Sequence, residues 1–249
     1  MQMQAHRGVS TECPENTMPA FRKAVEQGYP IIELDPRFTS DDVCVIHHDP
    51  TINRTCRTAA GEKFEESRPI AGITWQELRT LDAGLWFAEE FRGTKVPQMA
   101  EVLAFAKETG VHIKIDNVFA LHPAHQQEIL FRLVEESGAD AGFTCARLEV
   151  VEKVAARFPK ATIHYDGPVS EASLQQLKAV AKENPLVIWL PFDNRITAWC
   201  KLPKATKEMC QMVKTYGRVG MWILSEECDR QAAIAMGADI IETTGSLKP

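Results

Sequence analysis

The chain has 249 residues, of which 45% are hydrophobic and 25% charged, and its formal net charge is -6 at pH 7. This acidic balance argues against a nucleic-acid-binding protein, because such proteins present a basic stripe. No apolar run approaches the roughly 18 residues of a membrane span, and the N-terminus lacks a signal-peptide pattern. We therefore expect a cytoplasmic protein without stable membrane association. The seven cysteines form no CxxC pair, which argues against a disulfide framework.

Short apolar runs alternate with longer amphipathic runs along the chain. A helix is predicted over Met18–Gln27, ended by Gly28, and a last helix opens after Ser225 and ends at Gly237. Eight short apolar runs separated by helices are the count of a (β/α)8 TIM barrel, so we predict one such α/β domain over residues 1–249. The predicted strands are Gln2–His6, Ile31–Asp35, His112–Asp116, Ala141–Cys145, Ala161–Tyr165, Leu186–Leu190, Val219–Ile223 and Asp239–Glu242.

One stretch interrupts this alternation. Residues 50–95 are polar: the stretch is rich in arginine first and carries tryptophans later, and it contains no predicted barrel strand. The stretch is too long for an ordinary loop of a compact barrel. Within it, Thr74 to Leu78 has the pattern of a short capped helix. We therefore expect a small structured insertion after the second barrel strand, over the mouth of the barrel.

Ionisable residues gather at the predicted C-terminal strand ends, where the active sites of this fold lie. His6 ends the first strand, Glu33 and Asp35 end the second, and Asp116 ends the third. Because strand residues two apart point to the same side, Glu33 and Asp35 face inward together. Carboxylates this close repel unless a cation lies between them, and oxygen ligands suit Mg²⁺ or Ca²⁺ rather than zinc. The alternative for either carboxylate is an ion pair with an arginine such as Arg7.

Spaced motifs run through the chain, and together they are specific although each alone is weak. They are His6-Arg7-Gly8, Glu15-Asn16-Thr17, Glu33-Leu34-Asp35, His48-Asp49-Pro50, Asn53-Arg54-Thr55, Leu81-Asp82-Ala83-Gly84-x-Trp86, Val96-Pro97, Trp222 and Gly237-Ala238-Asp239. In these motifs the chain resembles the glycerophosphodiester phosphodiesterase family. The similarity spans essentially the whole chain and is densest up to about Leu103.

The resemblance implies a metal-dependent enzyme that hydrolyses a small glycerophosphodiester to an alcohol and glycerol 3-phosphate. It implies that His6 and His48 are the acid–base pair, that Arg7 clamps the phosphate, and that Glu33 and Asp35 are metal ligands. General chemistry points the same way, because a metal and an arginine neutralise the phosphate oxygens while imidazoles move protons near pH 7. Which histidine is the acid stays open, as does the oligomeric state.

The third strand departs from the family pattern. A third metal carboxylate usually comes from a Glu-x-Lys pair, and the matching residues here are Lys114, Ile115 and Asp116. In the preferred interpretation Asp116 is the third metal ligand, while Lys114 lies deeper in the site and pairs with a carboxylate. In the alternative, Lys114 replaces the metal and the chain is a non-catalytic relative that binds phosphate esters. A further alternative is attack by a substrate hydroxyl, which gives a cyclic phosphate as in phospholipase-D-like relatives.

The last two strands add two more candidates. Glu242 stands where the family usually has a Thr-Asp turn, and it approaches His6 if the barrel closes. It then orients that histidine or adds a metal ligand, or it makes an ordinary salt bridge or helix cap. Trp222 is either a wall of the alcohol pocket or a packed aromatic at the barrel end. The substrate-binding candidates are therefore Arg7, Lys114 and Trp222.

Overall fold

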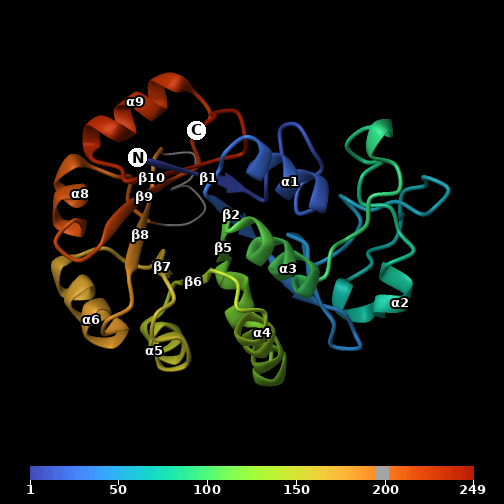
Figure 1. Cartoon of the computed structure of the whole chain (residues 1–249), viewed down its shortest axis with the longest axis horizontal. Helices are drawn as coiled ribbons and strands as arrows, with labels where there is room; N and C mark the ends of the chain where they lie inside the picture. The colour runs from blue at the N-terminus through green and yellow to red at the C-terminus, as the bar shows by residue number, and fades with distance from the viewer. Residues whose placement is uncertain (194–201) are drawn as a thin grey trace.

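Eight parallel strands close into a barrel (Figure 1). The computed structural model of the chain describes residues 1–193 and 202–249. The barrel strands are β1 (Gln2–His6), β2 (Ile31–Leu34), β5 (His112–Ile115), β6 (Ala141–Cys145), β7 (Ile163–Tyr165), β8 (Leu186–Pro191), β9 (Arg218–Trp222) and β10 (Ile240–Thr243). They neighbour one another in chain order, and β10 pairs with β1 to close the ring. The predicted TIM barrel is confirmed, and each predicted strand lies within two residues of the observed one.

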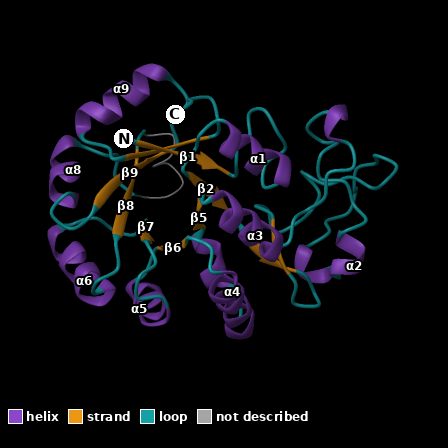
Figure 2. Cartoon of the chain, in the orientation of Figure 1, coloured by secondary structure: helices purple, strands orange, loops and turns teal. Residues whose placement is uncertain are grey.

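Helices surround this barrel (Figure 2). Each buries one apolar stripe against the strands; in α5, for example, Val150, Val151 and Val154 are buried on one side. Gly110, at the end of α3, and Gly237, at the end of α9, adopt left-handed backbone angles that suit glycine. The helices are α1 (Met18–Glu26), α3 (Met99–Thr109), α4 (Ala124–Ser137), α5 (Leu148–Arg157), α6 (Glu171–Ala181), α8 (Lys207–Val213) and α9 (Glu227–Met236).

The inside of the barrel is partly apolar and partly polar. Ile31, Val187, Trp189 and Ile240 form a small buried cluster of their own. Gly220 on β9 makes room for the indole, since a Cβ there would lie 2.5 Å from the Trp189 ring. The barrel strands also carry buried polar side chains, among them Gln4, Glu33, Lys114, Thr144, His164 and Glu242. Buried groups of this kind need partners, which directs attention to the site that they build.

The segment between β2 and α3 forms a separate structural unit beside the barrel (Figure 1). It begins with an antiparallel hairpin of β3 (Pro36–Phe38) and β4 (Cys44–Ile46), which the sequence analysis missed because strands of three residues show no clear periodicity. The short helix α2 (Trp75–Leu78) follows, and the Thr74 hydroxyl accepts from the Glu77 N–H as the capping pattern predicts. This unit has its own apolar cluster: Val45, Ile52, Cys56, Ile70, Ile73, Leu78, Leu81, Ala83 and Val96.

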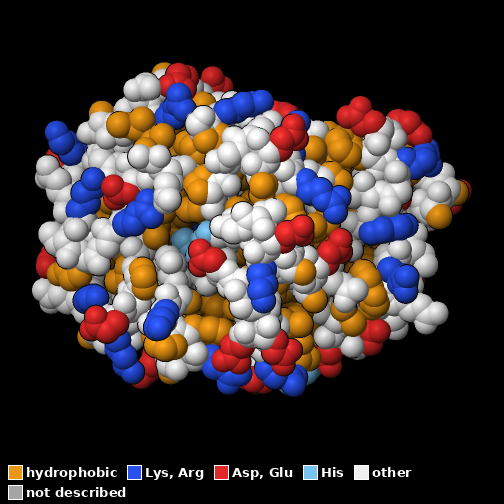
Figure 3. All heavy atoms as spheres, in the orientation of Figure 1, with side chains coloured by type: hydrophobic (Ala, Val, Ile, Leu, Met, Phe, Trp, Pro, Cys, Tyr) orange, Lys and Arg blue, Asp and Glu red, His pale blue; other side chains and the backbone are white. Residues whose placement is uncertain are grey.

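Three general features of the molecule concern its surface, its helices and its cysteines. Lysine and arginine side chains are interspersed with aspartate and glutamate on the face shown in Figure 3. No helix within residues 1–193 and 202–249 has the length and apolar character needed to cross a membrane. The six cysteines in those ranges are unpaired thiols, and Cys200 lies outside them.

Candidate active site

Three carboxylates meet at the C-terminal end of the barrel. Glu33 lies on β2, Asp35 directly follows that strand, and Asp116 directly follows β5. Leu34 pairs with Ile115 across the two strands, so Asp35 and Asp116 lie at the same level. One oxygen of each side chain lies within 4.8 Å of the others. We call these three residues the carboxylate triad, and they are the three predicted metal ligands.

Negative charge in the carboxylate triad is poorly compensated. Burial, followed by the charges of Asp35 and Glu242, raises the pKa of Glu33 well above its usual value. Burial, followed by Asp35, raises the pKa of Asp116 to about 6. The folded site therefore disfavours three adjacent anions. A divalent cation that prefers oxygen ligands removes this repulsion, so the donor set fits Mg²⁺ or Ca²⁺.

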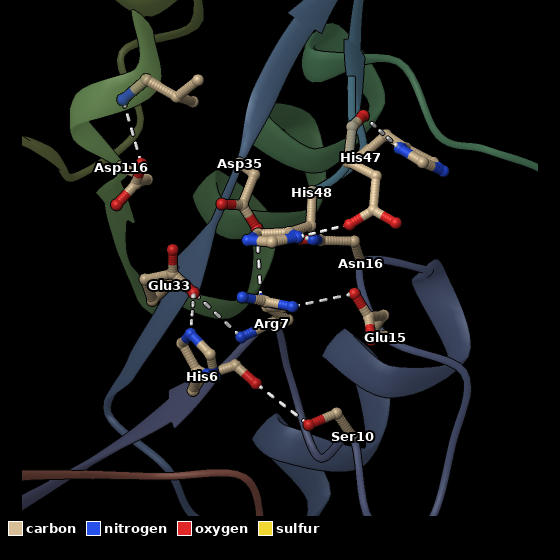
Figure 4. A network of polar contacts seen from close by, with 12 residues as sticks. His6, Arg7, Ser10, Glu15, Asn16, Glu33, Asp35, His47, His48 and Asp116 are labelled. Carbon is tan, nitrogen blue, oxygen red and sulfur yellow. Dashed lines mark hydrogen bonds and ion pairs between the residues drawn. The ribbon is translucent and has the colours of Figure 1, made fainter. Parts of the chain in front are cut away.

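The end of β1 carries His6 to the carboxylate triad, and the loop that follows carries Arg7 (Figure 4). The Nε2 atom of His6 lies 3.8 Å from Oε2 of Glu33. Arg7 has a left-handed φ of 59°, and its backbone N–H donates to Oε2 of Glu33 at 3.0 Å. The next residue has to be glycine, because a Cβ on Gly8 would lie 2.7 Å from the backbone of Ala20 in α1.

The Arg7 guanidinium is held between two carboxylates (Figure 4). Its Nη1 donates to Oε1 of Glu15 at 3.0 Å, and its Nε lies 3.5 Å from Oδ2 of Asp35. Arg54, which belongs to the unit beside the barrel, donates to both Glu15 oxygens at 2.8 and 2.7 Å. Burial alone would raise the pKa of Glu15, but Arg54 and Arg7 lower it to about 2. Glu15 is thus an anion that fixes Arg7 beside the carboxylate triad.

His48 reaches the site from the loop after β4. Its Nδ1 lies 2.6 Å from Oδ1 of Asp49. Arg54 donates to Oδ2 of Asp49 at 2.7 Å, and this bond holds the pKa of Asp49 well below its usual range. Asp49 is therefore an anion that accepts from the Nδ1–H of His48. That bond fixes the imidazole and leaves its Nε2 for other partners.

Lys114 lies on β5, two residues before Asp116 and deeper in the barrel. Its Nζ donates to Oε2 of Glu242 at 2.9 Å and lies 3.9 Å from the centre of the Trp189 ring. Burial alone would lower the pKa of Lys114, but the charges of Glu242 and Glu33 raise it, so the ammonium persists. The contact between Lys114 and a carboxylate, which the preferred interpretation of this strand expects, is present, and the partner is Glu242.

Glu242 connects Lys114 to the catalytic candidates. It pairs in register with Gln4 of β1, and the Gln4 side-chain amide donates to it. Its other oxygen, Oε1, lies 3.9 Å from Nε2 of His6. Glu242 is therefore a buried neighbour of His6 as well as the partner of the lysine.

A pocket of about 520 Å³ opens over the carboxylate triad, which is a size typical of small-molecule sites. All of the predicted site residues line it: His6, Arg7, Glu33, Asp35, His48, Lys114, Asp116 and Trp222. The sequence analysis did not select several other lining residues: Asn117, Thr144, Ala146, Asp166, Gly167, Pro168, Trp189, Leu202 and Ile223. For Asp166 a signal existed, because it directly follows the predicted strand Ala161–Tyr165.

Comparison with known proteins gives one family. Residues 6–137 match the sequence model of the Glycerophosphoryl diester phosphodiesterase family. A glycerophosphodiester phosphodiesterase of Caldanaerobacter subterraneus subsp. tengcongensis is 37% identical over 133 residues, which are 53% of this chain and 51% of that protein. A glycerophosphoinositol inositolphosphodiesterase of Mus musculus is 29% identical over 222 residues, which are 86% of this chain and 34% of that protein. The chain spans about half the length of the bacterial relatives that it matches.

Solved structures share the fold. A phosphodiesterase of Oleispira antarctica in complex with the product sn-glycerol-3-phosphate has a TM-score of 0.78 at 18% identity, over 99% of this chain and 94% of that chain. A putative glycerophosphoryl diester phosphodiesterase of Silicibacter pomeroyi has a TM-score of 0.78 at 19% identity, over 98% of this chain and 90% of that chain. At these identities the likeness establishes the barrel and its size.

Proposed function

Because the chain belongs to the glycerophosphoryl diester phosphodiesterase family, we propose that it hydrolyses glycerophosphodiesters to an alcohol and glycerol 3-phosphate. The observation that carries this proposal is the carboxylate triad, whose oxygens lie within 4.8 Å of one another in the same pocket as His6, Arg7 and His48. A divalent metal ion held by Glu33, Asp35 and Asp116, Mg²⁺ or Ca²⁺, would neutralise phosphate charge and lower the pKa of a water molecule.

In this proposal Arg7 clamps the phosphate. A phosphodiester is an anion that repels an incoming nucleophile, so its non-bridging oxygens need positive charge. The contacts with Glu15 and Asp35 fix the guanidinium at the pocket wall before substrate binds. An arginine held in this way offers N–H donors in the planar geometry that suits phosphate oxygens.

His6 acts as the general base and His48 as the general acid. Burial, followed by the charges of Arg7 and Lys114, lowers the pKa of His6 well below 6.5. His6 is therefore neutral at pH 7, and its imidazole takes the proton of the attacking water. His48 donates its Nδ1–H to the Asp49 carboxylate, so an imidazolium there has a charged partner, and its Nε2–H is free to protonate the departing alkoxide.

The contact of Lys114 supports catalysis over mere phosphate-ester binding. An ammonium that replaced the metal would have to lie among the oxygens of the carboxylate triad. The Lys114 Nζ instead pairs with Glu242 at 2.9 Å and stacks on Trp189. Lys114 therefore does not take the place of a metal ion among the three carboxylates, of which Asp35 also contacts Arg7.

The test is hydrolysis of glycerophosphocholine and glycerophosphoethanolamine with Mg²⁺, Ca²⁺ or Mn²⁺, followed by phosphorus NMR. We expect glycerol 3-phosphate as the product and complete loss of turnover in EDTA. His6→Ala and His48→Ala should each lower kcat by about 10²- to 10⁴-fold. His125→Ala is the control, because that side chain is 60% exposed and lies outside the pocket lining. Turnover that persists in EDTA, near-normal rates in either site variant, or a cyclic phosphate product would contradict this mechanism.

A further inference from the structure

The pocket wall across from His6 carries two buried oxygens without hydrogen-bond partners. In the circular strand order, β7 is the fourth strand from β1 in either direction, so its end lies across the barrel from His6. Asp166 directly follows β7, and Thr144 lies on the neighbouring β6. Among the residues that the structure describes, Oδ1 of Asp166 and Oγ1 of Thr144 make no hydrogen bond. Both residues line the pocket, which makes this wall a candidate ligand contact.

The other oxygen of the Asp166 carboxylate, Oδ2, is held in this wall by a hydrogen bond. Asn117, which directly follows Asp116 of the carboxylate triad, donates from Nδ2 to Oδ2 of Asp166 at 2.6 Å. Gly167 follows, and a Cβ there would lie 2.4 Å from the Tyr165 hydroxyl, so the chain turns tightly at this point. One carboxylate oxygen is thus fixed, the second one is buried without a donor among the described residues, and the residue itself lines the pocket.

Among the described residues, no cation forms an ion pair with Asp166. Burial, followed by the charge of Asp116, raises the pKa of Asp166 to about 6, as expected where no cation compensates the carboxylate. Among the described residues, the lysine and the arginine that line the pocket have other partners, since Lys114 pairs with Glu242 and Arg7 pairs with Glu15. A positive group brought by a ligand would complete the site.

We propose that Asp166 and Thr144 bind the alcohol half of the substrate and select a headgroup with a primary ammonium, an assignment that rests on the proposed phosphodiesterase function. A primary ammonium carries three N–H donors and a positive charge, so it suits a pocket wall that offers the Asp166 carboxylate and the Thr144 hydroxyl as acceptors. A trimethylammonium has the charge but no N–H donor. A hydroxyl has a donor but no charge.

The experiment compares kcat/KM for glycerophosphoethanolamine, glycerophosphocholine and glycerophosphoglycerol. The wild-type protein should prefer the ethanolamine diester. Asp166→Asn should lower the ratio of kcat/KM for the ethanolamine diester to that for the choline diester by about tenfold, the loss expected for one charge-assisted hydrogen bond. Thr144→Val, which removes the hydroxyl and keeps the shape, should lower the same ratio by a smaller factor.

The controls separate recognition from folding. The asparagine of Asp166→Asn can still accept from Asn117 through its amide oxygen, and thermal unfolding would verify its fold. Asp229→Asn makes the same chemical change on α9, outside the pocket lining, and should keep the wild-type ratio.

Each failure has its own signature. If Asp166→Asn leaves the ratio unchanged, or lowers the values for all three diesters by one common factor, Asp166 does not read the headgroup. If Asp166→Asn lowers kcat/KM for the ethanolamine and glycerol diesters equally relative to that for the choline diester, the residue recognises a neutral donor and the ammonium assignment is wrong. If the wild-type protein hydrolyses none of the three diesters with any ion, the proposed phosphodiesterase function itself fails and this assignment falls with it.

Discussion

Lys114 on β5 is a buried cation, and it forms an ion pair with Glu242 on β10. Removal of one partner from a buried ion pair leaves the other charge without compensation. Lys114→Met should therefore lower the free energy of unfolding by about 3 kcal/mol. The double variant Lys114→Met with Glu242→Leu should lose less than the sum of the two single variants, because neither charge is left alone. Urea unfolding in EDTA, followed by circular dichroism, measures all four proteins.

A surface ion pair supplies the matched control for Lys114. Arg157 on α5 contacts Glu135 on α4 at 2.6 Å, and both side chains are more than one third exposed. Arg157→Met should lower the free energy of unfolding much less than Lys114→Met does, since water screens such pairs. An equal cost for Lys114→Met and Arg157→Met would show that the Lys114 ammonium is not needed to compensate Glu242.

The candidate residues could be predicted from the sequence, but their partners could not. Glu33 and Asp35 follow from the two-residue period of one strand, which is local information. The partner of Lys114 is Glu242, 128 residues away, and only barrel closure and strand register bring the two together. Asp166 is a lone aspartate after a short apolar run, and no local pattern shows that one of its oxygens is buried without a donor.

At the scale of elements, the unit beside the barrel supplies His48 to the pocket, and its Arg54 connects the groups that hold His48 and Arg7. This side chain joins Glu15 of the β1–α1 loop to Asp49, the neighbour of His48. Arg54→Lys should lower kcat about tenfold, because an ammonium lacks the planar fork that binds both carboxylates, so His48 and Arg7 lose their fixed orientation. Stability should change by less than about 1 kcal/mol, since the Arg54 side chain is 42% exposed. Steady-state kinetics and thermal unfolding measure the two effects.

Arg68 provides the comparison within the same unit. It pairs with Glu77 on α2 and does not line the active-site pocket. Arg68→Lys should therefore leave kcat at the wild-type value. Full activity in Arg54→Lys would mean that the planar guanidinium of Arg54 is not needed to orient the catalytic groups.

Elements of the barrel were predictable to a greater extent than the unit beside it. The barrel strands are short and largely buried because both of their faces are covered, and mostly apolar runs such as β8 stand out in the sequence. The β3–β4 hairpin has three-residue strands, and the remainder of the unit is held by a small cluster that includes Ile52, Ile70 and Leu81. Apolar residues spaced this irregularly do not predict an element.

At the scale of the whole molecule, the carboxylate triad links folding to pH and to metal. The pKa of Asp116 rises from 3.8 to about 6 on folding, and that of Glu33 also rises. A carboxyl group with a raised pKa in the folded state stabilises the fold below its unfolded pKa. That contribution is lost as the pH rises through the folded value. In the metal-free protein, ionisation of Asp116 should therefore lower the free energy of unfolding as the pH rises from about 4 to about 6, and ionisation of Glu33 should lower it further.

Metal binding should reverse this loss, because a divalent cation binds the ionised carboxylates. Addition of Mg²⁺ or Ca²⁺ at about 100 times its dissociation constant should raise the free energy of unfolding by about 2.7 kcal/mol. At one fixed metal concentration, the gain in the free energy of unfolding should be larger at pH 7.5 than at pH 5, since at pH 5 protons compete for Asp116 and Glu33. Thermal unfolding with metal and with EDTA at the two pH values measures it. Asp116→Asn removes one ionisable ligand, so it should weaken the metal effect and flatten its pH dependence. An equal metal effect at both pH values, or an unchanged effect in Asp116→Asn, would place the bound ion elsewhere than at the carboxylate triad.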